Sequence, residues 1–129
     1  MPVPGFQKYF LPFLELVKDG KEHAMSELYE PLANHFKLTN EDKKELLPSG
    51  LQTRHINRVQ WTRTFLKKAL LIESSSRGKV RIIERGIKVL AENPKDINIK
   101  FLDRFPEFKE FRSGTKSDES ESILTPILP

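Results

Sequence analysis

The 129-residue sequence contains no cysteine, which excludes disulfide bridges, thiolate metal ligands and a cysteine nucleophile. No apolar run approaches the roughly 20 residues that a membrane-spanning helix requires, so we expect no membrane partner. The first residues also lack the basic start and apolar stretch of a secretory signal peptide. Hydrophobic residues make up only 37% of the chain and charged residues 31%, which predicts a modest core under a well-solvated surface. These absences favour a small cytoplasmic protein.

The positive charge is concentrated in the middle of the chain. The whole sequence has 22 basic and 18 acidic residues, but residues 54–88 contain ten basic residues and only two acidic ones. If these cations share one surface, they form a basic patch that favours a polyanionic partner. The alternative is a solvated helix whose cations balance acids elsewhere in the fold. The ten residues are Arg54, Arg58, Arg63, Lys67, Lys68, Arg77, Lys79, Arg81, Arg85 and Lys88.

Spacing and turn residues predict the order of the elements. Apolar residues over 6–17 recur at helical spacing and predict a first helix, and residues 21–25 suggest a brief strand. Ser26 is expected to cap a second helix, with Pro31 disfavoured deep inside it. Thr39 and Asp42 have the spacing of a capping box for a short third helix that extends to residues 46–47.

Beyond a long basic helix, strands over 71–73 and 79–83 and a turn over 74–78 predict a β-hairpin. A last helix is expected from Arg85 to Ala91. Helices packed as a helix-turn-helix and followed by a basic hairpin are typical of a winged helix. We therefore predict a mainly α fold with a small β-hairpin, a winged helix-turn-helix over residues 1–94.

The helix predicted from Arg54 to Leu71 separates apolar and polar residues onto opposite sides. The apolar side recurs at spacings of three, four and three residues: Val59, Thr62, Leu66 and Ala69. The polar side repeats this spacing about 200° around the helix: Asn57, Gln60, Thr64 and Lys67. Trp61, at the border, is expected to pack rather than to stack on a base. The sequence thus predicts one packing side and one side that faces outward.

Such a helix offers both kinds of contact that double-stranded DNA requires. Lysine and arginine bind phosphates, whereas Asn57 and Gln60 are candidates to pair with adenine. Arg77 and Lys79 flank Gly78 at the predicted wing tip and are placed for the backbone or the minor groove. The candidate DNA-binding residues of the 54–70 helix and the wing are Arg54, Asn57, Arg58, Gln60, Arg63, Thr64, Lys67, Lys68, Arg77, Lys79 and Arg81.

The segment after residue 94 changes in composition. Residues 95–112 are dense in apolar groups and would promote association if exposed. This extension therefore either folds back on the domain or pairs with a second copy, and the candidate dimer contacts are Phe101, Phe105, Phe108 and Phe111. Residues 113–129 are mostly small, polar and acidic and are expected to be a disordered linker or tail.

No catalytic or metal site is predicted, and we expect no cofactor. Residues 41–43 and 107–109 match the Glu-x-Lys spelling of a nuclease metal site, but neither lies on a predicted strand. The three histidines are scattered, which disfavours zinc, and no glycine-rich phosphate loop occurs. We expect this chain alone not to be an enzyme.

Two stretches carry a resemblance to a known family: NRVQWTRTFLKKALL and, closely after it, SRGKVRIIERG. With the opening PVPGFQKYFLPFLELVKDG and the trailer IKFLDRFPEFKEF, residues 1–112 resemble the N-terminal winged-helix domain of Mrr-type restriction endonucleases. The resemblance implies a DNA-recognition domain of a prokaryotic restriction system, associated with the nucleoid. In that family it precedes a metal-dependent nuclease domain that cuts modified foreign DNA.

The sequence holds no counterpart of that nuclease half. We therefore expect a fragment, a truncated gene or a free-standing regulator, with a nuclease domain or subunit acting in trans. The alternative function is a protein–protein interaction or dimerisation module without direct DNA binding.

Overall fold

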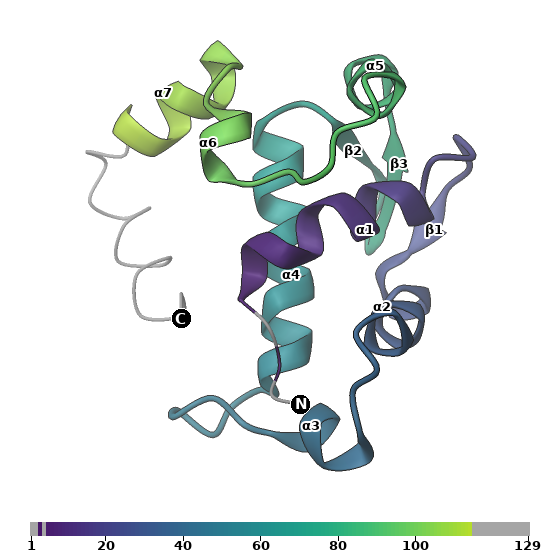
Figure 1. The fold of residues 1–129 in the computed structure, drawn as a ribbon, viewed down its shortest axis with the longest axis vertical. Coiled ribbons are helices and arrows are strands. Elements are labelled where there is room, and N and C mark those ends of the chain that lie inside the picture. The colour runs from purple at the N-terminus through teal and green to yellow at the C-terminus, as the bar shows by residue number, and fades with distance from the viewer. Residues whose placement is uncertain (1–2, 4, 115–129) are drawn as a thin grey trace.

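The structure is a computed structural model that describes residue 3 and residues 5–114 (Figure 1). Helices dominate it, beside a small antiparallel sheet, which confirms the mainly α fold. None of the helices in these residues is long and apolar enough to cross a membrane. In chain order the elements are the 3-10 helix η1 (Phe6–Tyr9), α1 (Phe10–Leu16), β1 (His23–Ala24), the 3-10 helix η2 (Met25–Glu27), α2 (Tyr29–His35), α3 (Asn40–Lys44), α4 (Arg54–Lys68), β2 (Ile72–Ser76), β3 (Lys79–Ile82), α5 (Glu84–Ala91), α6 (Ile99–Leu102) and α7 (Pro106–Gly114).

The sheet has the strand order β1-β3-β2, with both pairs antiparallel. β2 and β3 form the predicted hairpin, and its turn holds Gly78 at a φ of +73°, which glycine adopts without steric cost. β2 reaches Ser76 and so extends beyond the three residues predicted for it. The order of helices and strands is compatible with a winged helix-turn-helix, with α4 as the recognition helix and the hairpin as the wing.

The second helix begins differently from the prediction. Ser26 lies inside η2, and no side-chain hydrogen bond caps α2, so the predicted N-cap is wrong. The carboxylate of Glu27 instead accepts the backbone N–H of Ala24 at 3.0 Å. α2 starts at Tyr29, which places Pro31 in the first turn, where a missing N–H costs no intrahelical bond.

The capping box before α3 is confirmed. Thr39 Oγ1 accepts the N–H of Asp42, and Asp42 Oδ2 accepts the N–H of Thr39, both at 3.0 Å. α3 nevertheless ends at Lys44, earlier than predicted, and Leu46 forms an antiparallel bridge with Thr53. Residues 45–53 therefore form a closed loop at the start of α4.

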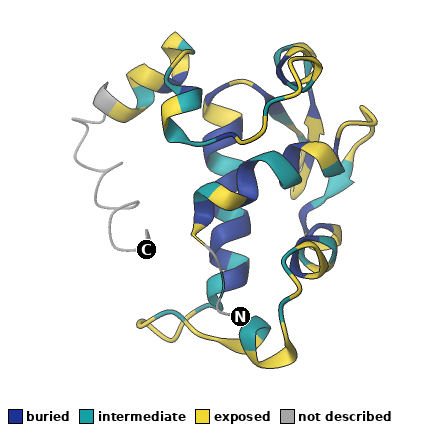
Figure 2. Ribbon diagram, in the orientation of Figure 1, coloured by how far each residue is buried: buried dark blue, intermediate teal, exposed yellow. Residues whose placement is uncertain are grey.

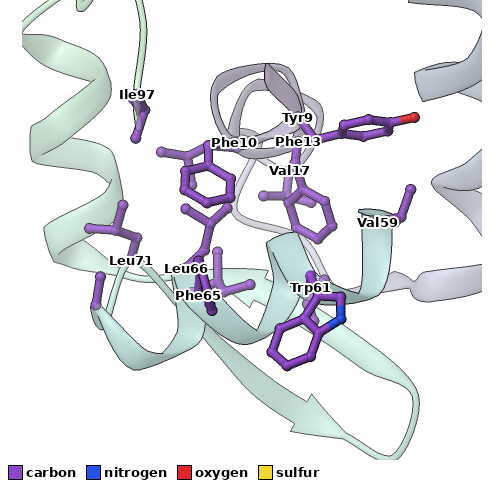
Figure 3. Packing of buried hydrophobic residues seen from close by; sticks show 14 of the residues in the cluster. Tyr9, Phe10, Phe13, Val17, Val59, Trp61, Phe65, Leu66, Leu71 and Ile97 are labelled. Atoms are coloured by element: carbon purple, nitrogen blue, oxygen red, sulfur yellow. The ribbon is translucent and has the colours of Figure 1, made fainter. Parts of the chain in front are cut away.

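The core forms where η1 and α1 pack against α4, and in Figure 3 Phe10, Phe13, Val17 and Leu66 lie between α1 and α4. The ring of Phe65 lies 5.3 Å from that of Phe6 and 5.8 Å from that of Phe10, both edge to face. Trp61 is buried against Phe65 at 5.7 Å, which confirms the packing interpretation. In Figure 2 buried residues run along α4, while the loop after α3 is exposed.

At Gly86, helix α5 comes close to Leu71, between α4 and β2, and to Ile82 of β3. A Cβ atom at this position would lie 2.3 Å from the carbonyl oxygen of Leu71 and 2.7 Å from Cγ1 of Ile82. Because real Cβ atoms do not come so near to backbone oxygen, only glycine fits here without displacement of the neighbours.

The aromatic extension folds back on the domain, the first of its two predicted arrangements. Ile97, Leu102 and Phe108 are fully buried, and the ring of Phe108 lies 5.7 Å from that of Phe65 on α4. Pro106 is the first residue of α7, where its missing N–H costs no intrahelical bond. Of the tail predicted over 113–129, residues 115–129 lie outside the described residues.

Candidate nucleic-acid interface

Helix α4 begins with a side-chain cap and runs through the centre of the fold. Thr53 Oγ1 accepts the N–H of Ile56 at 3.2 Å, which satisfies one of the unpaired donors of the first turn. The predicted packing side is confirmed, since Val59, Leu66 and Ala69 are fully buried. This side faces η1 and α1 in Figure 3.

Two of the candidate DNA-binding residues of α4 are not at the surface. Asn57 is 1% exposed and Arg58 is 4% exposed, so the expectation that they face solvent is wrong. The loop over residues 45–53 contributes Gln52, whose side chain bonds to Asn57 and Gln60. Helical spacing could not reveal these hydrogen bonds, because Gln52 lies in a loop that precedes the helix.

Gln52, Asn57, Gln60 and Tyr29 are joined by hydrogen bonds. Asn57 Nδ2 donates to Gln52 Oε1 at 3.2 Å, and Gln52 Nε2 donates to Gln60 Oε1 at 2.8 Å. Gln60 Nε2 in turn donates to the hydroxyl of Tyr29 on α2 at 3.4 Å. Sequence reasoning missed Gln52 and Tyr29, because neither is charged nor part of the α4 spacing.

The remaining candidates on α4 differ in their surroundings. Arg54 forms an ion pair with Glu45 at 3.0 Å. Arg63 and Thr64 are half-buried, and the hydroxyl of Thr64 donates to the backbone carbonyl of Gln60 at 3.2 Å. Lys67 and Lys68 are both exposed on the last turn of the helix, and the ammonium group of Lys68 lies 5.3 Å from the ring centre of Phe111.

The wing residues are exposed, but two of them are paired. Arg77 lies at the tip without a carboxylate partner in the part of the chain that the structure describes. Lys79 Nζ lies 3.7 Å from a carboxylate oxygen of Glu22, and Arg81 Nε donates to Glu73 at 3.1 Å.

The ten cations of residues 54–88 do not form one continuous positive patch. Five of them are paired with carboxylates: Arg54 with Glu45, Lys79 with Glu22, Arg81 with Glu73, Arg85 with Glu107 and Lys88 with Glu84. The prediction of one basic patch made of all ten cations is therefore wrong, and for these five the alternative holds, in which cations balance acids elsewhere in the fold. Three of the acids come from outside the segment, so the fold supplies neutralising charge that counts along the sequence do not show. Within residues 5–114, the cations without a carboxylate partner include Arg63, Lys67, Lys68 and Arg77.

Burial changes the ionisation of two groups near the start of α4. Desolvation lowers the pKa of His55, whose ring lies between Tyr9 and the backbone of Tyr29. Desolvation also lowers the pKa of Arg58, and the neighbouring Arg54 adds to that shift. Across residues 5–114, no group of three or more His, Asp or Glu side chains is arranged to hold a metal ion.

A family model described as the Mrr N-terminal domain matches residues 6–92. The chain belongs to the Mrr N-terminal domain family. The match runs from η1 through α5, so α4 and the wing both lie inside the family's domain.

One curated relative extends the comparison to a larger protein. The type IV methyl-directed restriction enzyme EcoKMrr of Escherichia coli (strain K12) is 30% identical over 96 residues, which are 74% of this chain and 31% of that enzyme. The chain therefore spans about a third of the length of this relative. No solved structure matches the chain. The Mrr N-terminal domain is thus a restriction-system-related domain.

Proposed function

We propose that this Mrr N-terminal domain is a DNA-binding winged-helix module that contacts the duplex through α4 and the wing. The observation that carries the proposal is the presence of Arg63, Lys67 and Lys68 on two successive turns of α4 without a carboxylate partner among the described residues. Unneutralised cations gathered on one helix are a source of attraction for phosphates. The major groove of B-DNA is wide enough to admit a helix.

The side of α4 available to DNA is narrower than its spacing predicts. Gln60, Thr64 and Lys67 keep at least partial exposure, whereas Asn57 is covered. We therefore assign base contact to Gln60 and Thr64, and phosphate contact to Lys67 and Lys68. Asn57 is buried, so we assign it no direct contact with DNA.

The wing supplies a second contact. Arg77 is exposed at its tip, where an arginine side chain suits the negative potential of the minor groove. The ion pairs of Lys79 and Arg81 are exposed, and exposed pairs contribute only about 0–1 kcal/mol. Phosphate oxygens can therefore replace Glu22 and Glu73 as partners of these cations at little cost.

Cleavage belongs to another part of the system in this proposal. The relative in Escherichia coli is named a methyl-directed restriction enzyme, and this chain matches about a third of it. We assign DNA recognition to this chain, with methylated duplex as the preferred ligand, and cutting to a nuclease domain or subunit in trans. No residue of this chain is proposed to be catalytic.

The phenylalanine segment gives the dimerisation alternative little support. Phe108 is fully buried inside the same chain. Phe101, Phe105 and Phe111 are half-buried, and the cations of Arg104, Arg85 and Lys68, respectively, lie 4.1, 4.7 and 5.3 Å from their ring centres. Sedimentation at tens of micromolar tests this alternative, and the proposal expects a monomer in the absence of DNA.

The test is a fluorescence-anisotropy titration with methylated and unmethylated duplexes at two salt concentrations. Neutralisation of about four phosphates predicts a slope near −3.6 for log affinity against log salt, or about a 100-fold loss between roughly 50 and 200 mM. Absence of binding at low salt, or affinity independent of salt, would contradict the proposal. Equal affinity for the two duplexes would contradict the methyl preference alone.

A further inference from the structure

A continuous chain of hydrogen bonds links the buried Arg58 to the hydroxyl of Tyr29. Arg58 donates to Asn57 Oδ1 at 3.3 Å, and the amide of Asn57 donates to Gln52 at 3.2 Å. Gln52 donates to Gln60 at 2.8 Å, and Gln60 donates to the Tyr29 hydroxyl at 3.4 Å. In each of these four hydrogen bonds, the donor is the residue nearer to Arg58 in the series.

The guanidinium group explains this common direction. Arginine can only donate, so the oxygen of Asn57 must face Arg58 and its NH2 group must face Gln52. The same reasoning then fixes Gln52 and Gln60, because each amide that accepts through its oxygen offers its NH2 group to the next residue. Reversal of one amide would place two donors or two acceptors against each other.

The direction of the chain determines what the Tyr29 hydroxyl can offer. Since this hydroxyl accepts from Gln60, its own hydrogen is available to another acceptor. Gln60 is the sole hydrogen-bond partner of the hydroxyl that residues 5–114 provide. Tyr29 is half-buried on α2, beside the side of α4 that we propose to face DNA.

We propose that Tyr29 is a further DNA-contact residue whose hydroxyl donates to a phosphate oxygen, and that Arg58 holds it in this role through Asn57, Gln52 and Gln60. The inference rests on the proposed function. Phosphate oxygens accept hydrogen bonds, and tyrosine hydroxyls are among the groups that contact them. In a helix-turn-helix, a helix that precedes the recognition helix crosses the DNA backbone. Here α2 precedes α4 in the chain, with the short α3 between them, and packs against α4. Asn57 is then a positioning residue rather than a base-reading one.

The first test is Tyr29→Phe, which removes the hydroxyl and keeps the ring that lies against His55. We expect about tenfold weaker binding on every duplex alike, because one hydrogen bond to a charged group is lost. Unchanged affinity would overturn the inference. A loss confined to particular sequences would assign the hydroxyl to a base edge and would overturn the phosphate assignment.

The second test uses Asn57→Asp to reverse the direction of the hydrogen bonds between position 57 and Tyr29. A carboxylate accepts from both neighbours, so Gln52 must turn its NH2 group toward position 57 and present its oxygen to Gln60. Gln60 then turns as well, and Tyr29 must donate its hydrogen to Gln60 instead of to DNA. We expect a loss of affinity at least as large as that of Tyr29→Phe.

The double variant separates this effect from the added negative charge. In the Tyr29→Phe background, Asn57→Asp can act only through charge, so the two losses are expected to be non-additive by about tenfold. Strictly additive losses would overturn the inference that the hydrogen-bond chain from Arg58 orients the hydroxyl of Tyr29. If Asn57→Asp does not fold, Gln60→Glu imposes the same reversal on Tyr29 and enters the same cycle.

The two proposals fail in different ways. If the unmodified chain binds no DNA at low salt, the proposed function fails. If it binds with the expected salt dependence and Tyr29→Phe binds equally well, only this inference fails.

Discussion

Tyr9 donates its hydroxyl hydrogen to Nδ1 of His55 at 2.8 Å and thereby joins η1 to the first turn of α4. The other ring nitrogen, Nε2, donates to the backbone carbonyl of Tyr29 at 2.7 Å. Because a carbonyl only accepts, Nε2 carries a proton. Burial lowers the pKa of His55, so near neutral pH the ring is neutral and Nδ1 accepts from the hydroxyl of Tyr9. This pair fixes the start of α4 against two other elements.

Tyr9→Phe removes one partner of a buried bond. We expect a loss of about 1–3 kcal/mol in the free energy of unfolding, since Nδ1 of His55 is left without a donor in the interior. Urea denaturation followed by circular dichroism measures it. Tyr29→Phe is the matched control and is expected to lose less, because Tyr29 is only half-buried. Equal losses of unfolding free energy in the two variants would contradict a larger contribution of the Tyr9–His55 bond to stability.

The same histidine predicts a pH dependence of stability. Burial is the main reason why the pKa of folded His55 lies below its ordinary value of 6.5, and Lys43 adds to that shift. The bond to Tyr29 and the charge of Glu30 oppose the shift less strongly. Between the lowered value and 6.5, the unfolded chain binds more protons than the folded one, so stability falls as the pH falls through about 6.5.

The measurement is the urea midpoint at several pH values between about 7.5 and 5.5 for the unmodified chain and for His55→Gln. The variant is less stable overall but is expected to show a flatter dependence on pH over this range. The same slope in both proteins would contradict a lowered pKa at His55.

The aromatic extension is part of the core and not an appendage. Phe108→Ala is expected to cost about 3–5 kcal/mol, because it empties space against Phe65 and Phe111. Phe101→Ala, at a half-buried position, is expected to cost less. A Phe108→Ala variant as stable as the unmodified chain in urea would contradict the packing of α7 on α4.

The helices, the turn of the wing and the capping box could be predicted where the residues that determine them are close together in the sequence. The spacing of Val59 and Leu66 gives the packing side of α4, and Gly78 marks the turn of the wing. The Thr39–Asp42 capping box is likewise contained within four residues. Such features depend on near neighbours in the chain, so one sequence suffices to find them.

The surface of the site was less predictable, because it depends on distant partners. Glu22 and Glu107 neutralise cations of the wing and of α5 from 57 and 22 residues away. Asn57 is buried and donates to Gln52, a loop residue that no periodicity connects to α4. A count of charges in residues 54–88 therefore overestimates the positive charge that DNA would meet.

Gly86 tests the close approach of α5 to Leu71 and Ile82. Gly86→Ala is expected to destabilise the fold, because the new methyl group collides with the backbone oxygen of Leu71. Gly5→Ala is the control: no atom lies within 4 Å of the added group, and the backbone is in an ordinary extended conformation. Thermal unfolding of both variants gives the comparison, and a Gly86→Ala midpoint equal to that of Gly5→Ala would contradict the contact.

The most direct measurement of the central claim is the salt dependence of DNA binding by a Lys67→Ala/Lys68→Ala variant. Its matched control is Lys95→Ala/Lys100→Ala, which removes two exposed charges that belong neither to α4 nor to the wing. If the end of α4 binds phosphates, the first variant has lower affinity for all sequences and a salt slope smaller by about 1.8, and the control keeps the slope of the unmodified chain. Equal slopes in the two variants would contradict the assignment of α4 to DNA.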